Sequence, residues 1–171
     1  MNHTLMALIS KKSKPELISD FRPINLCNMI YKLVIKVITN RLKLLLPFVI
    51  STSQGASVQG RLISDNILIA YMQGDFAAHG TIALKLDMSK AFDCVEWTFL
   101  AQIMLRLGFP RCWVDLVMKC VQMASFSFLI NDSPRGHLLP TRGIRQGDPL
   151  SPYLFLFSSE GLSCLLSKAT W

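Results

Sequence analysis

The stretch TIALKLDMSKAFDCVEW, residues 81–97, places a carboxylate at the end of an apolar run, where it would be salt-bridged or bound to a metal ion. Asp87 ends an apolar run that is typical of a buried strand, and Asp93 follows six residues later. A carboxylate buried at a strand end is costly unless it is paired or binds a metal. The residues alone favour a salt bridge from Asp87 to Lys85 or Lys90 over a metal site. Asp93 has a simpler explanation, because an acid early in the following helix interacts with the positive end of its dipole.

The loop TRGIRQGDPLSP is the second stretch with chemical potential. Its glycines allow close backbone approach, its arginines carry charge, and its glutamine amide can donate and accept hydrogen bonds together. These residues are Arg142, Gly143, Arg145, Gln146 and Gly147. Such a loop suits the phosphates or base edges of a nucleotide, although a turn rich in Gly and Pro before a helix has a similar composition.

Positive charge is concentrated in the first third of the chain. The net charge is +7, and residues 1–61 hold nine basic and two acidic side chains, so the remainder balances to zero. This distribution is typical of a surface that meets phosphates. The alternative is a solvated helix face, which is the commoner explanation of a charged run.

These residues must be positioned by an α+β arrangement in one unit. The first half of the chain is predicted to hold a helix over 29–46 ended by Pro47, an extended loop over 51–62, a helix from Ser64 that fades at Gly74, and a strand over 81–87. Two helices follow, one over 96–109 closed by Gly108 and one opened by Pro110. The chain then forms a β-hairpin over 125–140 and a last helix, which Ser151 caps and in which Pro152 takes the first position.

Two of these helices have a predicted buried face. The first is expected to bury apolar residues at positions 29, 30, 33, 34, 37, 38, 42, 45 and 46, with Lys32, Lys36, Asn40 and Lys43 on its other face. The helix after Pro110 is expected to bury Trp113, Leu116, Val117, Cys120 and Val121.

Composition excludes several classes of protein. With 51% hydrophobic and 17% charged residues the chain is globular, and no apolar run approaches the roughly 18 residues of a membrane span. The N-terminal MNHTLMALIS lacks the pattern of a secretion signal, so we expect an intracellular protein in the nucleus or cytoplasm. The five cysteines have no zinc-site spacing and are expected to be reduced. The common P-loop, dinucleotide-binding and serine-hydrolase motifs do not occur.

Four blocks in order resemble the reverse transcriptase of non-LTR (LINE-type) retrotransposons, particularly those of plants. The blocks are FRPINLCNMIYKLVIKVITNRL, QGASVQGRLISDN, ALKLDMSKAFDCVEW and GIRQGDPLSPYLF. The resemblance runs from about His3 to Lys168 and implies a right-hand polymerase fold. Residues 1–80 would be fingers-like, and residues 81–171 would form a partial palm, with an incomplete antiparallel sheet packed against helices.

The resemblance also implies roles for single residues. Asp87 matches the first catalytic aspartate, which in this family binds two Mg²⁺ ions. Phe92 matches an aromatic gate against the ribonucleotide 2′-hydroxyl. The alternative role for Phe92 is packing under the strand, which needs only a bulky ring. The residues that match nucleotide-binding positions are Arg22, Arg61, Gln146 and Gly147. Lys32, Lys36 and Lys43 become candidates for contacting a nucleic-acid backbone.

The family's second metal-binding block, which contains two adjacent aspartates, is absent from the sequence, and so are the remaining palm and the thumb. We therefore expect a fragment of an RNA-directed DNA polymerase that is inactive alone. The intact enzyme would bind an RNA template, a DNA primer and a dNTP, and we expect no association with a membrane. RNA-templated DNA synthesis by the 171-residue chain would contradict this. Two alternatives stay open: a noncatalytic nucleic-acid binder, whose affinity falls with salt, and a nonfunctional remnant that folds poorly with apolar surface exposed.

Overall fold

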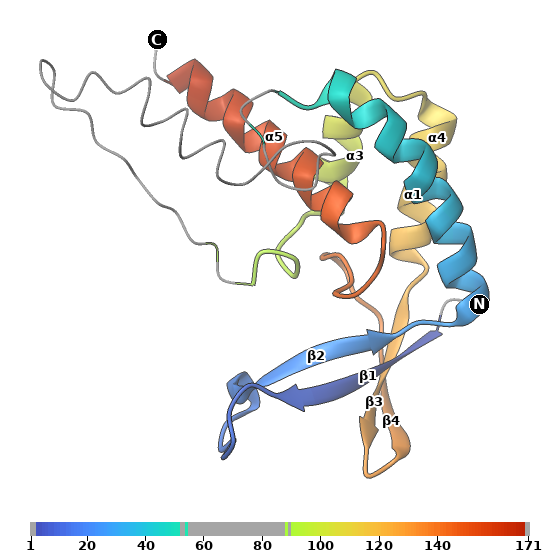
Figure 1. The fold of residues 1–171 in the computed structure, drawn as a ribbon, viewed down its shortest axis with the longest axis vertical. Coiled ribbons are helices and arrows are strands. Elements are labelled where there is room, and N and C mark those ends of the chain that lie inside the picture. Colours follow the sequence, from blue (N-terminus) through green and yellow to red (C-terminus); the bar gives the residue numbers. More distant parts are fainter. Residues whose placement is uncertain (1–2, 52–53, 55–87, 89, 170–171) are drawn as a thin grey trace, which may run out of the picture.

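The structure is a computed structural model that describes residues 3–51, 54, 88 and 90–169. Its elements are β1 (His3–Ser10), a 3₁₀ turn (Ile18–Asp20), β2 (Phe21–Leu26), α1 (Met29–Val49), α3 (Trp97–Arg106), α4 (Arg111–Gln122), β3 (Ser125–Ile130), β4 (Ser133–Leu138) and α5 (Ser151–Ala169). The predicted strand over 81–87 and the helix predicted from Ser64 lie outside the described residues. The four helices gather into one body, and the sheet extends from one end of it (Figure 1).

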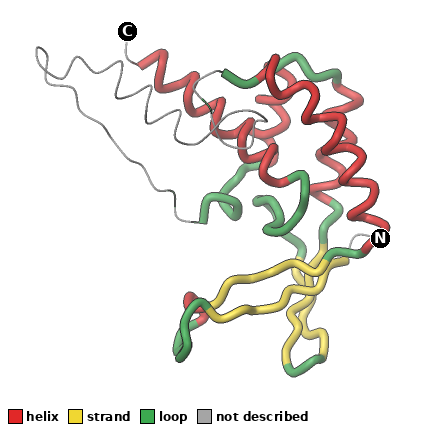
Figure 2. The backbone as a smooth tube through the Cα atoms, viewed as in Figure 1, coloured by secondary structure: helices red, strands yellow, loops and turns green. Residues whose placement is uncertain are grey.

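The sheet has the strand order β2-β1-β3-β4. The β3–β4 pair is antiparallel, as expected for the hairpin, and β1 pairs antiparallel with β2. The expectation of a purely antiparallel sheet was wrong, because β1 runs parallel to β3, from His3 beside Ser125 to Met6 beside Phe128. The sheet is therefore mixed (Figure 2). It joins β1 and β2, which precede the boundary predicted near residue 80, with β3 and β4, which follow it, as the sequence colours of Figure 1 show. The α+β class is confirmed. β1 and β2 were not predicted as strands, and much of their surface is exposed.

The C-terminal hairpin confirms its prediction and has a tight turn. Asn131 and Asp132 both have positive φ angles, 49° and 58°, which is the conformation of a two-residue hairpin turn that Asn and Asp tolerate. β4 begins directly after them at Ser133, so the turn is shorter than the NDSPRG stretch suggested.

The predicted buried face of α1 is largely wrong. Its buried residues are Ile35, Ile38, Thr39, Leu42 and Leu46. Apolar side chains on the opposite side are exposed, among them Ile30, Val37 and Phe48. Pro47 does not end the helix, which continues to Val49. A proline so close to the end removes one hydrogen bond, and the Ile50 N–H still donates to the Leu46 carbonyl at 3.0 Å.

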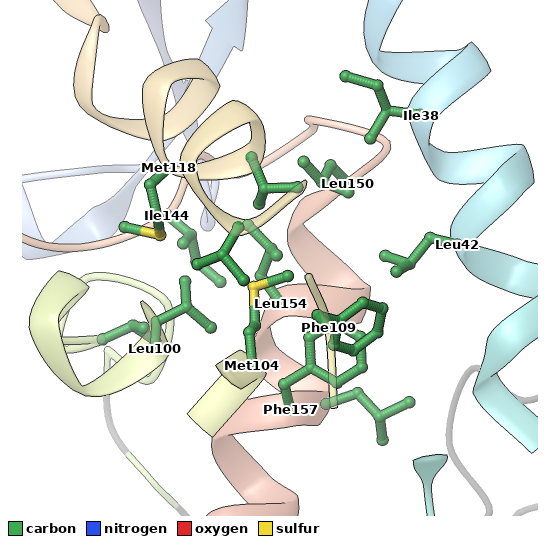
Figure 3. Packing of buried hydrophobic residues seen from close by; sticks show 14 of the residues in the cluster. Ile38, Leu42, Leu100, Met104, Phe109, Met118, Ile144, Leu150, Leu154 and Phe157 are labelled. Carbon is green, nitrogen blue, oxygen red and sulfur yellow. The ribbon is translucent and has the colours of Figure 1, made fainter. Parts of the chain in front are cut away.

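The hydrophobic core lies between the four helices (Figure 3). Leu42 from α1, Met104 from α3 and Val117 from α4 are fully buried there beside Phe157 of α5. Phe109 meets Phe157 edge-on, with 5.4 Å between the ring centroids. Burial of such side chains supplies the main favourable free energy of folding.

The other helices follow their predictions in part. α3 closes at Gly108, whose φ is +89°, and α4 begins directly after Pro110. On α4 the structure buries Val114, Val117 and Met118, with Trp113, Cys120 and Val121 partly buried; the prediction of Leu116 was wrong, since it is 43% exposed. None of the helices in the described ranges is long and apolar enough to cross a membrane.

Candidate nucleotide site

The loop between β4 and α5 is anchored to residues 92–95 by main-chain hydrogen bonds. The Gly143 N–H donates to the Val95 carbonyl at 2.8 Å, and the Ile144 N–H donates to the Phe92 carbonyl at 2.9 Å. The Trp97 Nε1–H donates to the Gly143 carbonyl at 2.7 Å. Two blocks that lie about fifty residues apart in sequence therefore form one unit.

Gly143 makes this close approach possible. Its φ is +86°, and a Cβ atom there would lie 3.0 Å from the Asp93 carbonyl oxygen and 3.2 Å from the Asp93 Cα. Both atoms belong to the backbone and cannot move aside as a side chain could. Glycine at this position is therefore required by conformation and by space.

Phe92, Gln146 and Gly147 line one groove, together with Asp148, Pro149, Ser151 and Pro152. Three of the residues that the sequence singled out for nucleotide binding are thus brought together. The Phe92 ring is half-buried and stacks on Phe155 of α5, with 5.2 Å between centroids and 12° between planes. Phe92 therefore packs against the core and also lines the groove, while its role as a gate against a 2′-hydroxyl stays a prediction.

Gly147 is exposed and has a φ of +85°, but a Cβ atom there would meet nothing closer than the Asn25 carbonyl oxygen at 4.0 Å. Glycine is favoured at position 147 by the positive φ angle, and the absence of a side chain there leaves space in the groove. The neighbouring Gln146 carbonyl accepts a hydrogen bond from Asn25 Nδ2 of β2 at 3.2 Å. The loop is therefore attached to the sheet as well as to residues 92–95.

A cavity of about 210 Å³ lies between the sheet and this loop, lined in part by Asn25, Tyr31 and Gln146. Within the described part of the chain, Asn25 Oδ1 is buried without a hydrogen-bond donor. The hydrogen bond to Gln146 assigns the amide nitrogen to the loop side, so the oxygen is the atom left unpaired.

Arg145 is buried, which corrects the expectation that it brings charge to a ligand. Its side chain is 6% exposed, and its Nη2 donates to the Cys120 carbonyl at 3.0 Å. Its Nη1 lies 3.3 Å from Thr4 Oγ1 and donates to it, and the guanidinium stands over the Tyr31 ring at 4.4 Å. The loop's other arginine, Arg142, is exposed and lies 3.4 Å from Glu96.

Asp148 is the buried acid of the same loop. It is 6% exposed, Oδ2 accepts a hydrogen bond from the Tyr31 hydroxyl at 2.7 Å, and Oδ1 accepts one from the Leu150 N–H at 2.9 Å. Burial, and then the charge of Asp148, raise the pKa of the Tyr31 phenol well above its usual range, which Arg145 opposes. Tyr31 therefore stays protonated and acts as the donor. Burial likewise raises the pKa of the Cys120 thiol.

The prediction that Ser151 caps the last helix and Pro152 takes its first position was wrong by one residue. α5 begins at Ser151, but the first helical hydrogen bond runs from the Leu154 N–H to the Leu150 carbonyl at 3.2 Å. Leu150 is therefore the cap, and Ser151 is the first helical residue.

Arg22 does not reach the groove. It is exposed on β2, where successive side chains alternate between the two faces of the sheet. Arg22 therefore lies on the face opposite to Pro23 and Asn25, which line the cavity.

The prediction for Asp93 was wrong, because α3 begins only at Trp97 and the exposed Asp93 precedes it. Asp87 and Arg61 lie outside the described residues, and within those residues no group of three or more His, Cys, Asp or Glu could hold a metal.

The three lysines of α1 are exposed on one side of the helix. Lys43 Nζ stands 5.7 Å from the centroid of the Tyr153 ring of α5, which is within reach of a cation–π contact. Lys36 lies about two turns before Lys43 on the same side, and Lys32 lies about three turns before it. This arrangement agrees with either a backbone-facing surface or a solvated face.

Tyr31, Asn25 and Asp148 were missed by the sequence-based prediction. Each is polar within an apolar or glycine-rich stretch, and that isolation was the available signal. A polar residue at a buried position needs a partner, but the partner's identity follows only from the fold.

A family model described as reverse transcriptase (RNA-dependent DNA polymerase) matches residues 9–170. The chain is 35% identical over 167 residues to the Transposon TX1 uncharacterized 149 kDa protein of Xenopus laevis, covering 96% of this chain and 13% of that protein. It is 26% identical over 163 residues to the Retrovirus-related Pol polyprotein from type-1 retrotransposable element R2 of Popillia japonica, covering 94% and 23%. The chain spans less than a quarter of the length of these relatives.

Proposed function

Because the chain belongs to the reverse transcriptase (RNA-dependent DNA polymerase) family, we propose that its described residues form the nucleotide-selecting part of an RNA-directed DNA polymerase. The resemblance to non-LTR retrotransposon enzymes is confirmed, while the plant assignment stays a prediction. The observation that carries the proposal is the single groove lined by Phe92, Gln146 and Gly147.

In this proposal the sugar of the incoming nucleotide lies against the Phe92 ring. The ring is fixed from behind by Phe155, so a 2′-hydroxyl would meet an aromatic group that cannot withdraw. Gln146 would offer its amide to the nucleotide, and Gly147 leaves room for a base or sugar to approach the backbone. Arg22 and Arg61 stay predictions for the triphosphate contact.

The intact enzyme would use an RNA template, a DNA primer and a dNTP, inside the cell in the nucleus or cytoplasm. Asp87 would hold the metal, with Mg²⁺ as the expected ion. A pair of such ions, when bound, would activate the primer 3′-hydroxyl and stabilise the leaving pyrophosphate. Since Asp87 lies outside the described residues, we assign the groove only the selection and orientation of the nucleotide.

The proposal is tested by titrating the purified chain with dGTP and with GTP. We expect dGTP to bind about tenfold more tightly, and Phe92→Val to remove most of this preference by giving space to the 2′-hydroxyl. Phe99→Val is the matched control, because Phe99 of α3 does not line the groove. Equal binding of the two nucleotides by the unsubstituted chain would contradict the proposed function.

A noncatalytic nucleic-acid binder is the second candidate, favoured by the exposure of Lys32, Lys36 and Lys43 along α1. It predicts that Lys36→Glu lowers the salt dependence of binding to an RNA–DNA duplex by about 0.7–0.9 in log–log slope per lost phosphate contact. Lys119→Glu on α4 is the control, since Lys119 is equally exposed. Salt-independent binding, or none, would remove this candidate.

A further inference from the structure

The loop between β4 and α5, residues 139–150, is called the groove loop below. Two buried charged residues of this loop flank the segment that lines the groove. Arg145 and Asp148 are each 6% exposed, and between them lie Gln146 and Gly147, which line the groove. Both ends of the Gln146–Gly147 segment are therefore fixed by side chains that point into the protein while the segment itself faces outward.

The buried side chains connect the loop to three other elements. Arg145 donates to the Cys120 carbonyl near the end of α4 and to Thr4 of β1, at 3.0 and 3.3 Å. Its guanidinium stacks over Tyr31 of α1. The Tyr31 hydroxyl donates in turn to Asp148 at 2.7 Å. Tyr31 thus contacts the residues on both sides of the groove segment.

We propose that Arg145, Tyr31 and Asp148 act together as positioning residues that hold Gln146 and Gly147 against Phe92 for nucleotide binding. We name these three residues the Arg145 clamp. The inference rests on the proposed function of the groove, and it assigns the clamp a role through the groove residues rather than through contact with the nucleotide.

The chemistry of the clamp favours positioning over packing alone. Buried charged groups are costly to desolvate, and apolar residues of similar volume often stabilise a protein as well or better. What the polar set adds is direction: the planar guanidinium stacks on one ring while donating to two oxygens, and each Asp148 oxygen has its own donor. Such fixed directions are what a preorganised binding loop needs.

The first test measures the order of the loop without any nucleotide. Tyr31→Phe keeps the ring over Arg145 and removes the donor to Asp148. Because that hydrogen bond is to a charged group, we expect exchange of the Leu150 amide to rise about tenfold while the amides of α3 keep their rates. Tyr153→Phe is the matched control, as it removes the hydroxyl of a half-buried tyrosine outside the clamp. An unchanged Leu150 amide, or an equal rise throughout α3, would overturn the inference.

The second test measures nucleotide binding through Trp97, whose indole donates to the Gly143 carbonyl at the base of the loop. Trp97 becomes the sole reporter when Trp113 and Trp171 are replaced by Phe. We expect Tyr31→Phe and Arg145→Lys to weaken dGTP binding about tenfold, since neither retains the full set of directed contacts. The inference is wrong if both variants bind dGTP as the unsubstituted chain does.

These two arms separate the inference from the proposed function. If the unsubstituted chain binds no dGTP, the proposed function fails, and the amide exchange of Tyr31→Phe still decides whether the clamp orders the loop. If dGTP binds and Tyr31→Phe loosens the loop without weakening binding, the proposed function stands and the positioning role is contradicted.

Discussion

Gly143 and Gly147 share a backbone conformation and differ in their surroundings, so they form a matched pair. Both have φ near +85°, but only Gly143 lies against backbone atoms of Asp93. We expect Gly143→Ala to lower the free energy of unfolding by about 2–5 kcal/mol, combining left-handed strain with overpacking. Gly147→Ala should cost only about 1–2 kcal/mol, because it adds strain alone. Urea denaturation measures both, and equal losses would contradict the close approach at Gly143.

Asp20 gives the β1–β2 hairpin a dependence on pH. A hydrogen bond with Lys12, followed by the N–H groups of Leu17 and Glu16, lowers the pKa of its carboxyl. A lowered pKa means that the stabilisation is fully present above the unfolded pKa, near 4, and is lost as the pH falls through the folded value.

The amide shifts of Glu16 and Leu17 should therefore titrate with a midpoint below about pH 3.9, the usual Asp value. Asp20→Asn serves as the control and should abolish this transition, because both amides donate to the Asp20 carboxylate at 3.0 Å. A midpoint at or above the usual value would show that the carboxylate is not held as described.

Among whole helices and strands, α1 has two apolar sides. One packs in the core through residues such as Leu42, which is fully buried, and the other exposes Phe48 at 86%. We expect Phe48→Glu to leave the free energy of unfolding within about 0.5 kcal/mol and to reduce self-association by shrinking the apolar surface.

Leu42→Ala on the same helix is the matched comparison and should cost about 2–5 kcal/mol through lost burial and a cavity. Urea denaturation and light scattering at increasing concentration measure the two effects. A large destabilisation by Phe48→Glu would mean that this face is covered in solution.

α1 also shows what its sequence could and could not predict. The helical period was clear, and the helix is present, but apolar residues occur on both sides, so the period could not choose the buried one. β1 and β2 escaped prediction because the four-stranded sheet, rather than a pronounced alternation of apolar residues, defines them. The hairpin at Asn131 and the helix end at Gly108 were predictable because both depend on local backbone chemistry.

The candidate site was predictable only in part. Phe92, Gln146 and Gly147 were predicted from the resemblance, and the structure places them in one groove. The Arg145 clamp was not predicted, since its contacts join residues more than a hundred positions apart, as from Tyr31 to Asp148. Non-local pairs of this kind have no signature in a single sequence.

The molecule as a whole combines a helical body with a mixed sheet, and the groove loop lies where they meet (Figure 1). The loop is tied to the sheet through Asn25 and Arg145, and to α1 through Tyr31. A change in the position of the sheet would therefore shift Gln146 and Gly147.

In the function proposed for this protein, the groove selects a nucleotide that pairs with an RNA template. This function is tested most directly with an RNA template annealed to a DNA primer that lacks a 3′-hydroxyl, so that binding is measured without catalysis. We expect the dNTP complementary to the next template base to slow dissociation of the purified chain from the duplex, and a mismatched dNTP to leave it unchanged. Equal effects of the two nucleotides, or no effect of either, would contradict it.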